Sequence, residues 1–170
     1  MSRTSLVATL LAASLVSPLS FAQLNQLSAD DKDFIEYAGE FDLSSVRLAS
    51  LAQTKGTTPA VKAFARTLER EHTADLRKLT AIAGKTGGIV PNTLDDPHAA
   101  QIKQVAKAKD AAFDHQFLKT VVLEHEQALA SFKREADGGS TPELQAYAKA
   151  LLPYLERHMK QAKKLAGETS

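Results

Sequence analysis

The chain has 170 residues, with 21 Lys and Arg side chains against 20 Asp and Glu, which gives a net charge of +1 at pH 7. This balance lacks the basic excess that is typical of nucleic-acid-binding proteins, so we expect no nucleic-acid partner. Cysteine is absent, which excludes disulfides, thiol chemistry, iron–sulfur clusters and cysteine-ligated zinc.

Residues 1–22 have the pattern of a cleaved export signal. Arg3 gives a positive start, residues 6–16 form an apolar run, and Ser20-Phe21-Ala22 places small residues where a signal peptidase cuts. The run is shorter than the roughly 20 apolar residues that span a bilayer. We therefore expect a single domain, residues 23–170, that is periplasmic or secreted and has no transmembrane segment. The alternative is an uncleaved N-terminal anchor.

Two helices are predicted in the first half of the chain. Ser28 followed by Asp31 is similar to a capping box, and apolar residues then recur at helical spacing to about Thr54. After Gly56, Thr58-Pro59 gives an N-cap and a first helical residue, and the second helix ends near Gly84.

A long connection follows, from Gly84 to Pro97. Asp96 and Pro97 are expected as N-cap and first residue of a polar helical segment that breaks or bends near Asp110. The third main helix carries apolar residues from Phe113 to Ala136.

The fourth helix begins at Ser140-Thr141-Pro142-Glu143 and runs to about Leu165. Pro153 lies inside it, where it removes a backbone hydrogen bond and is expected to bend the helix before His158. The bend either follows the curvature of the core or turns His158 inward.

No segment alternates β-branched and polar residues as strands do. Four helices of about 25 residues are each roughly 38 Å long. Because the first and last links are short, they make antiparallel helix pairs, joined by the long middle connection. The sequence therefore predicts an all-α four-helix bundle.

Three histidines lie in phase with the apolar stripes of three different helices. These are His72, His125 and His158, and their distances from the helix ends place them at heights that agree within about one turn. His98 and His115 fall out of phase. We therefore expect three imidazoles to meet in the core at one level.

Neutral imidazole is the commonest metal ligand in proteins. Glu69-x-x-His72 has the spacing found in di-iron bundles, but only one such motif is present, and a di-iron centre needs two. Asp42 is the only in-phase carboxylate on the first helix. The leading hypothesis is one transition-metal ion, namely zinc, iron or copper, held by His72, His125 and His158 with Asp42 or Glu69 assisting.

The alternative hypothesis is a metal-free structural or interaction module with a buried polar core. The histidines would then find partners in Asp42, Ser45, Glu69 and Asp75. Burial would hold their pKa values down, so stability would fall near pH 6. A ferroxidase has the least support because carboxylates are too few. No catalytic motif points to an enzyme or a substrate.

Several short segments, in this order, resemble the exported bacterial ferritin-like bundles of domain-of-unknown-function family 4142. They are Ala63-Phe64-Ala65, Glu71-His72-Thr73, Val90-Pro91, Ala112-Phe113-Asp114, Glu124-His125, Phe132-Lys133-Arg134-Glu135-Ala136, Leu152-Pro153 and Leu155-Glu156-Arg157-His158. The resemblance implies a ferritin-like fold and an envelope location, and it implies no established activity. The family pattern has a glutamate where this chain has Ser45, so Asp42 one turn earlier either replaces it or the ligand is lost.

Overall fold

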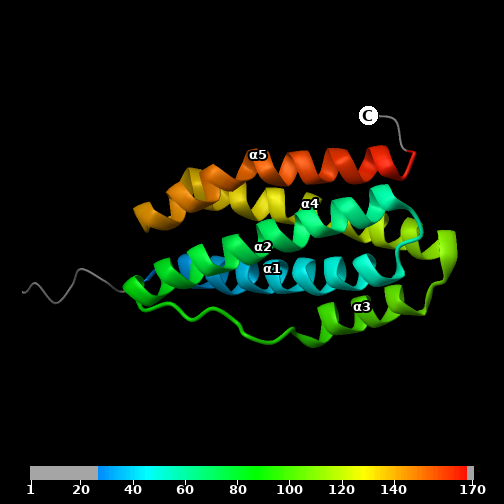
Figure 1. The fold of residues 1–170 in the computed structure, drawn as a ribbon. Helices are drawn as coiled ribbons and strands as arrows, with labels where there is room; N and C mark the ends of the chain where they lie inside the picture. The colour runs from blue at the N-terminus through cyan, green and yellow to red at the C-terminus, as the bar shows by residue number, and fades with distance from the viewer. Residues whose placement is uncertain (1–26, 168–170) are drawn as a thin grey trace, which may run out of the picture.

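The structure, a computed structural model, describes residues 27–167; the predicted signal peptide lies outside this range. Within it the regular structure is entirely α-helical (Figure 1). The elements are α1 (Ala29–Lys55), α2 (Pro59–Thr86), α3 (Asp96–Lys107), α4 (Asp110–Gly138) and α5 (Pro142–Leu165).

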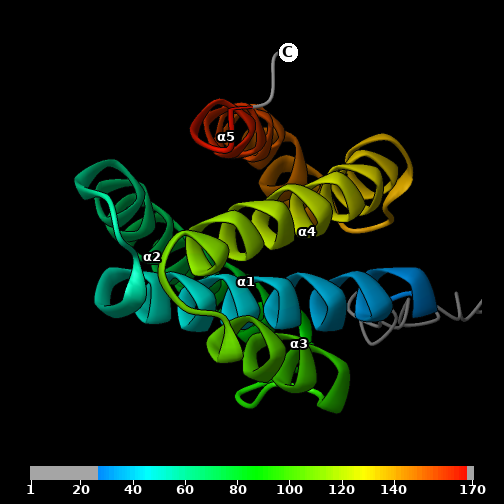
Figure 2. The ribbon, with the colours of Figure 1, turned by 90° about the vertical axis from the view of Figure 1, so that its right-hand side faces the viewer.

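The four long helices form the predicted bundle. α1 packs against α2 and α4, and α5 packs against α4 and α2. The chain reverses direction between α1 and α2 and again between α4 and α5, so each pair is antiparallel (Figure 1). The shorter α3 lies along the outside of the bundle against α1 and α4 (Figure 2). None of the described helices is long and apolar enough to cross a membrane.

The capping residues set the helix starts that the sequence indicates. The Ser28 hydroxyl accepts a hydrogen bond from the Asp31 amide at 3.0 Å, and the Thr58 hydroxyl accepts one from Val61 at 3.2 Å. The start of α3 differs by one residue from the prediction. Asp95, not Asp96, is the N-cap, because its carboxylate accepts the His98 amide at 2.9 Å.

The predicted break near Asp110 is confirmed. α3 ends at Lys107, and α4 begins at Asp110, whose φ of 50° lies in the left-handed region. This turn lets α4 join the bundle while α3 stays outside it. Lys55 donates a hydrogen bond to the Ala106 carbonyl and so attaches α3 to the end of α1.

The connection between α2 and α3 runs close to α1 at Gly39. A Cβ atom added at Gly39 would lie 2.8 Å from Pro91 Cδ and 2.9 Å from Val90 Cγ1. Glycine at this position therefore permits the connection to pack against α1.

The core consists of two apolar clusters separated along the bundle axis. The first contains Phe34, Ile35, Ala38, Phe41, Leu79, Ala83, Ala128, Phe132, Leu144, Tyr147, Ala148, Leu151 and Leu155 among its buried residues. The second contains Leu48, Ala49, Ala52, Val61, Phe64, Ala65, Leu68, Val105, Phe113, Phe117, Leu118, Val121 and Ala162. On every long helix the chain passes from one cluster to the other through a short polar stretch, and these stretches together form the candidate site.

Candidate metal site

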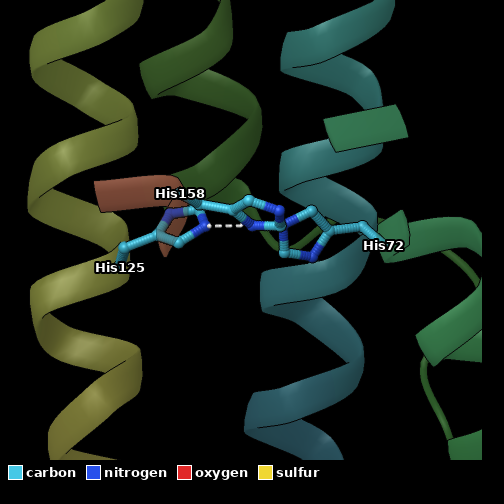
Figure 3. A group of neighbouring side chains, drawn as sticks. All are labelled: His72, His125 and His158. Atoms are coloured by element: carbon cyan, nitrogen blue, oxygen red, sulfur yellow. Dashed lines mark hydrogen bonds between the residues drawn. The ribbon is translucent and has the colours of Figure 1, made fainter. Parts of the chain in front are cut away.

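The three predicted histidines meet in the polar layer. His72 comes from α2, His125 from α4 and His158 from α5, and each is only 1 % exposed. The ring centroids are 5.4 Å apart for all three pairs. One nitrogen from each ring lies within 4.8 Å of the others (Figure 3). α5 continues as a helix through Pro153 and presents His158 to this layer.

Asp42 on α1 fixes the orientation of the His72 ring. Its Oδ1 lies 2.8 Å from His72 Nδ1, and the carboxylate is itself 1 % exposed. The other ring nitrogen, His72 Nε2, is buried and has no hydrogen-bond partner. A buried nitrogen without a partner is costly unless a ligand occupies it.

The other two rings are held by different acceptors. His125 Nδ1 lies 2.9 Å from the Val121 carbonyl oxygen, one turn earlier on α4. His158 Nε2 lies 2.7 Å from Glu71 Oε2 on α2. Arg157 also donates to Glu71 Oε2, at 2.6 Å, and holds the carboxylate in place.

These partners define which nitrogens are free. A carbonyl or an ionised carboxylate only accepts hydrogen bonds, so His125 Nδ1 and His158 Nε2 carry their ring protons, and His72 Nδ1 carries one when Asp42 is ionised. The remaining nitrogens then present lone pairs toward one another. Two of these, His125 Nε2 and His158 Nδ1, are 3.3 Å apart. Two nitrogens bound at 2.0–2.1 Å to a tetrahedral ion would be about 3.3 to 3.4 Å apart. The spacing of this pair therefore fits a shared metal ion, and the His72 nitrogen lies within 4.8 Å of both.

Burial keeps the imidazoles neutral. It lowers the pKa of His72 and of His158 from 6.5 to about 4, and it lowers the pKa of His125 well below its usual range. Phe41 contacts two of the rings edge-on, with centroid distances of 5.1 Å to His72 and to His125. Neutral imidazoles in an apolar enclosure are the form in which histidine binds metal.

The two predicted carboxylates occupy different places. Asp42 reaches the site, where it contacts the proton-bearing side of His72. Glu69 does not join the histidines, because its Oε2 accepts a hydrogen bond from Gln53 on α1 at 2.5 Å. Ser45, one turn after Asp42 on α1, is buried, and its hydroxyl has no hydrogen-bond partner.

Glu71 is a residue of the candidate site to which the sequence analysis gave no role. It precedes His72 directly, which turns it about 100° round the helix toward α5 instead of into the core. Arg157, which donates a hydrogen bond to Glu71, has the equivalent position on α5, because it directly precedes His158. That pair of opposite charges, each adjacent to an in-phase histidine, was the signal for an α2–α5 contact.

A second group of potential ligands, Glu40, Asp95 and His98, lies where α1 faces the start of α3. It is only half-buried. Asp95 Oδ1 lies 2.6 Å from His98 Nδ1 and also caps α3, so these groups already serve the helix start. The buried three-histidine site has no such structural explanation.

The fold and the site together define a class: an all-α four-helix bundle with a buried centre of three histidines on three helices. Within this class the chain belongs to the family described as domain of unknown function DUF4142, whose model matches residues 16–165. A comparison with curated proteins gave no match.

Solved structures share the fold. A DUF305 fragment from Deinococcus radiodurans is similar with a TM-score of 0.74 and 15% identity, over 83% of this chain and 97% of the other. CopM in a Cu(I)-bound form has a TM-score of 0.67 and 20% identity, over 81% and 94%. CopM in a Cu(II)-bound form has a TM-score of 0.68 and 19% identity, over 84% and 98%.

Proposed function

We propose that this protein is exported and binds one transition-metal ion through His72 Nε2, His125 Nε2 and His158 Nδ1. The observation that carries the proposal is the convergence of one nitrogen from each ring within 4.8 Å, with the other nitrogen of every ring already engaged. Asp42 and Glu71 are proposed to orient two of the ligands through their ring N–H groups, as is common around metal-bound histidines. Glu69 has no part in this ligand set.

Three neutral imidazoles suit zinc or copper. Copper also deserves testing because CopM, which shares the fold, has been solved with copper and with silver. A cysteine-free chain offers no thiolate to compete for either ion. We propose that the role is to hold metal in the cell envelope and to protect against its excess, without a defined reaction.

Metal content distinguishes this function from the metal-free one. The untagged protein is loaded with zinc or copper, dialysed, and analysed for bound metal beside His72→Ala/His125→Ala. A matched control is His115→Ala, because His115 is an exposed histidine on α4. We expect one ion per chain in the wild type and the control and none in the double variant. Negligible metal in all three proteins would remove the proposal.

The alternative, a metal-free module with a polar core, has one observation in its favour. Burial and the nearby Asp75 raise the pKa of Asp42 well above its usual range. A protonated Asp42 would donate to His72 Nδ1 and move the ring proton to Nε2. That proton would point toward the centre of the three-histidine cluster, where Nε2 has no hydrogen-bond partner. The metal analysis above separates the two functions, because the metal-free module predicts no retained ion.

Export is tested at the N-terminus. We propose cleavage after Ala22, because residues 1–22 have the pattern of a signal peptide. Sequencing of the processed protein from its native envelope fraction should begin at Gln23. A protein that retains Met1 and remains in the cytoplasmic fraction would contradict the proposal.

A further inference from the structure

A cavity lies between the start of α1 and the end of α4, remote from the histidines. Its volume is about 370 Å³, which is within the range of small-molecule sites. The two helix ends lie at the same end of the bundle (Figure 1). Its lining includes Asp30, Asp33, Phe34, Tyr37, Arg134 and Glu135.

Glu135 is the unexplained group in this cavity. The residue is only 5 % exposed, and its Oε1 is buried without a hydrogen-bond partner. A Cβ atom added at Gly139 would lie 2.1 Å from this oxygen, so glycine leaves the space that the carboxylate occupies. A buried carboxylate with an unpaired oxygen destabilises the fold, and a bound cation would offset this cost.

The surrounding charge is negative. Asp30 and Asp33 line the same cavity, and Arg134 is the only cationic side chain among the lining residues. No ion pair joins Arg134 to a carboxylate among the described residues. The last turn of α4 contains no basic residue, so its carbonyl end is also uncompensated. Together these groups favour a positively charged ligand.

The walls indicate the kind of cation. Phe34 and Tyr37 add aromatic surface to the acidic lining. Carboxylates beside aromatic rings suit an ammonium group on a short carbon chain, since the rings contact both the methylenes and the charge. The carboxylates of Asp30, Asp33 and Glu135 do not bring one oxygen each within 4.8 Å of one another, so the arrangement fits a compact metal ion less well.

We propose that this cavity binds a small organic ammonium cation, with the Glu135 carboxylate as its main partner and Asp33 as a second one. The ligand class is a linear diamine or polyamine, whose separate charges match separate carboxylates. Burial, and to a lesser extent the charges of Asp31 and Asp30, raises the pKa of Glu135 to about 7. Near neutral pH a bound ammonium would therefore take the place of the proton on this carboxyl.

Calorimetric titration with putrescine tests the proposal on the whole protein, with 1,4-butanediol as a neutral analogue and Ca²⁺ as a metal arm. We expect saturable 1:1 binding of putrescine alone. Glu135→Gln, which keeps the side-chain shape, should weaken binding about tenfold or more. Asp33→Asn, at an exposed position on α1, should weaken putrescine binding less.

Asp137→Asn is the matched control, because Asp137 is an exposed α4 carboxylate outside the cavity lining. It should change putrescine affinity less than twofold, roughly the limit of a diffuse charge effect. Thermal melting of each variant shows whether it is folded. Absence of putrescine binding, binding of Ca²⁺ instead, or an equal loss in Asp137→Asn would each overturn the proposal.

Discussion

Asp42 contributes to the site by holding the His72 ring through a hydrogen bond at Nδ1. It accepts the Nδ1 proton of His72 at 2.8 Å and so keeps Nε2 as the free nitrogen. Replacement by asparagine retains an oxygen that can accept this hydrogen bond but removes the negative charge. The charge matters because it raises the electron density of a ligating imidazole.

We therefore expect Asp42→Asn to bind metal about 10 to 100 times more weakly than the wild type, with one ion per chain still reached at saturation. Competition with a chelator of known affinity measures the change, and Asp137→Asn serves as the control. An unchanged affinity would show that Asp42 serves packing alone.

Glu135 makes the stability of the protein depend on pH. Its pKa is raised from 4.5 to about 7, chiefly by burial. A carboxyl whose pKa is higher in the folded than in the unfolded state favours folding while it is protonated. That contribution is present at low pH and is lost as pH rises from about 4.5 through 7.

The expected result is that Glu135→Gln becomes more stable than the wild type above pH 7, by on the order of 2 kcal/mol, and equal to it near pH 4. Urea unfolding across this pH range, in the absence of amines, measures the difference. A gap that is constant with pH would contradict the assignment of the shift to this residue.

Residue-level prediction from the sequence succeeded where one helix decides the outcome and failed where two helices do. The inward position of His72, His125 and His158 follows from periodicity on each helix alone. The choice between Glu69 and Glu71 depends on how α2 is rotated against α1 and α5. Glu69 meets Gln53 and Glu71 meets His158. No pattern within α2 distinguishes those environments.

At the scale of elements, the two helix pairs cap each other's turns. Asp31 on α1 accepts hydrogen bonds from the Ser140 amide at 2.9 Å and the Thr141 hydroxyl at 2.7 Å, in the turn between α4 and α5. Asp114 on α4 does the same for Thr57, between α1 and α2, with its amide at 2.9 Å and its hydroxyl at 2.6 Å.

The two matching contacts correspond to a weak repeat in the sequence. Asp31 precedes Gly56 by the same number of residues as Asp114 precedes Gly139, and the turns read Gly-Thr-Thr-Pro and Gly-Ser-Thr-Pro. The helix boundaries were predictable because caps and prolines are local signals. The role of Asp31 was not, because the capping-box interpretation kept its carboxylate within α1, whereas it binds the other helix pair.

Because these contacts lie at opposite ends of the bundle, their loss should be additive. We expect Asp31→Ala and Asp114→Ala each to lower the free energy of unfolding by about 2 kcal/mol, since each removes a charged acceptor and leaves a turn amide unpaired. The double variant should lose about the sum. Chemical denaturation measures all three against Asp137→Ala, which should stay within about 0.5 kcal/mol of wild type. A strongly non-additive double variant would mean that the two ends are coupled.

On the scale of the whole molecule, the histidine layer interrupts an otherwise apolar core. It separates the two hydrophobic clusters and introduces buried polar residues, among them the four at its centre, Asp42, His72, His125 and His158. Buried polar groups that are only partly satisfied are less stabilising than apolar side chains of similar size. The layer is therefore understandable as a functional feature that costs stability in the metal-free protein.

Replacement of all four residues by leucine tests this interpretation. The free energy of unfolding of the metal-free variant should be about 1 to 4 kcal/mol higher than that of the metal-free wild type, by analogy with other buried polar clusters. Metal should then stabilise only the wild type, by about 2.7 kcal/mol when the free ion is 100 times its dissociation constant. Urea unfolding with and without zinc or copper measures both effects. A leucine variant that is less stable than the metal-free wild type would instead make the polar layer part of the fold's own stability, as the metal-free module requires.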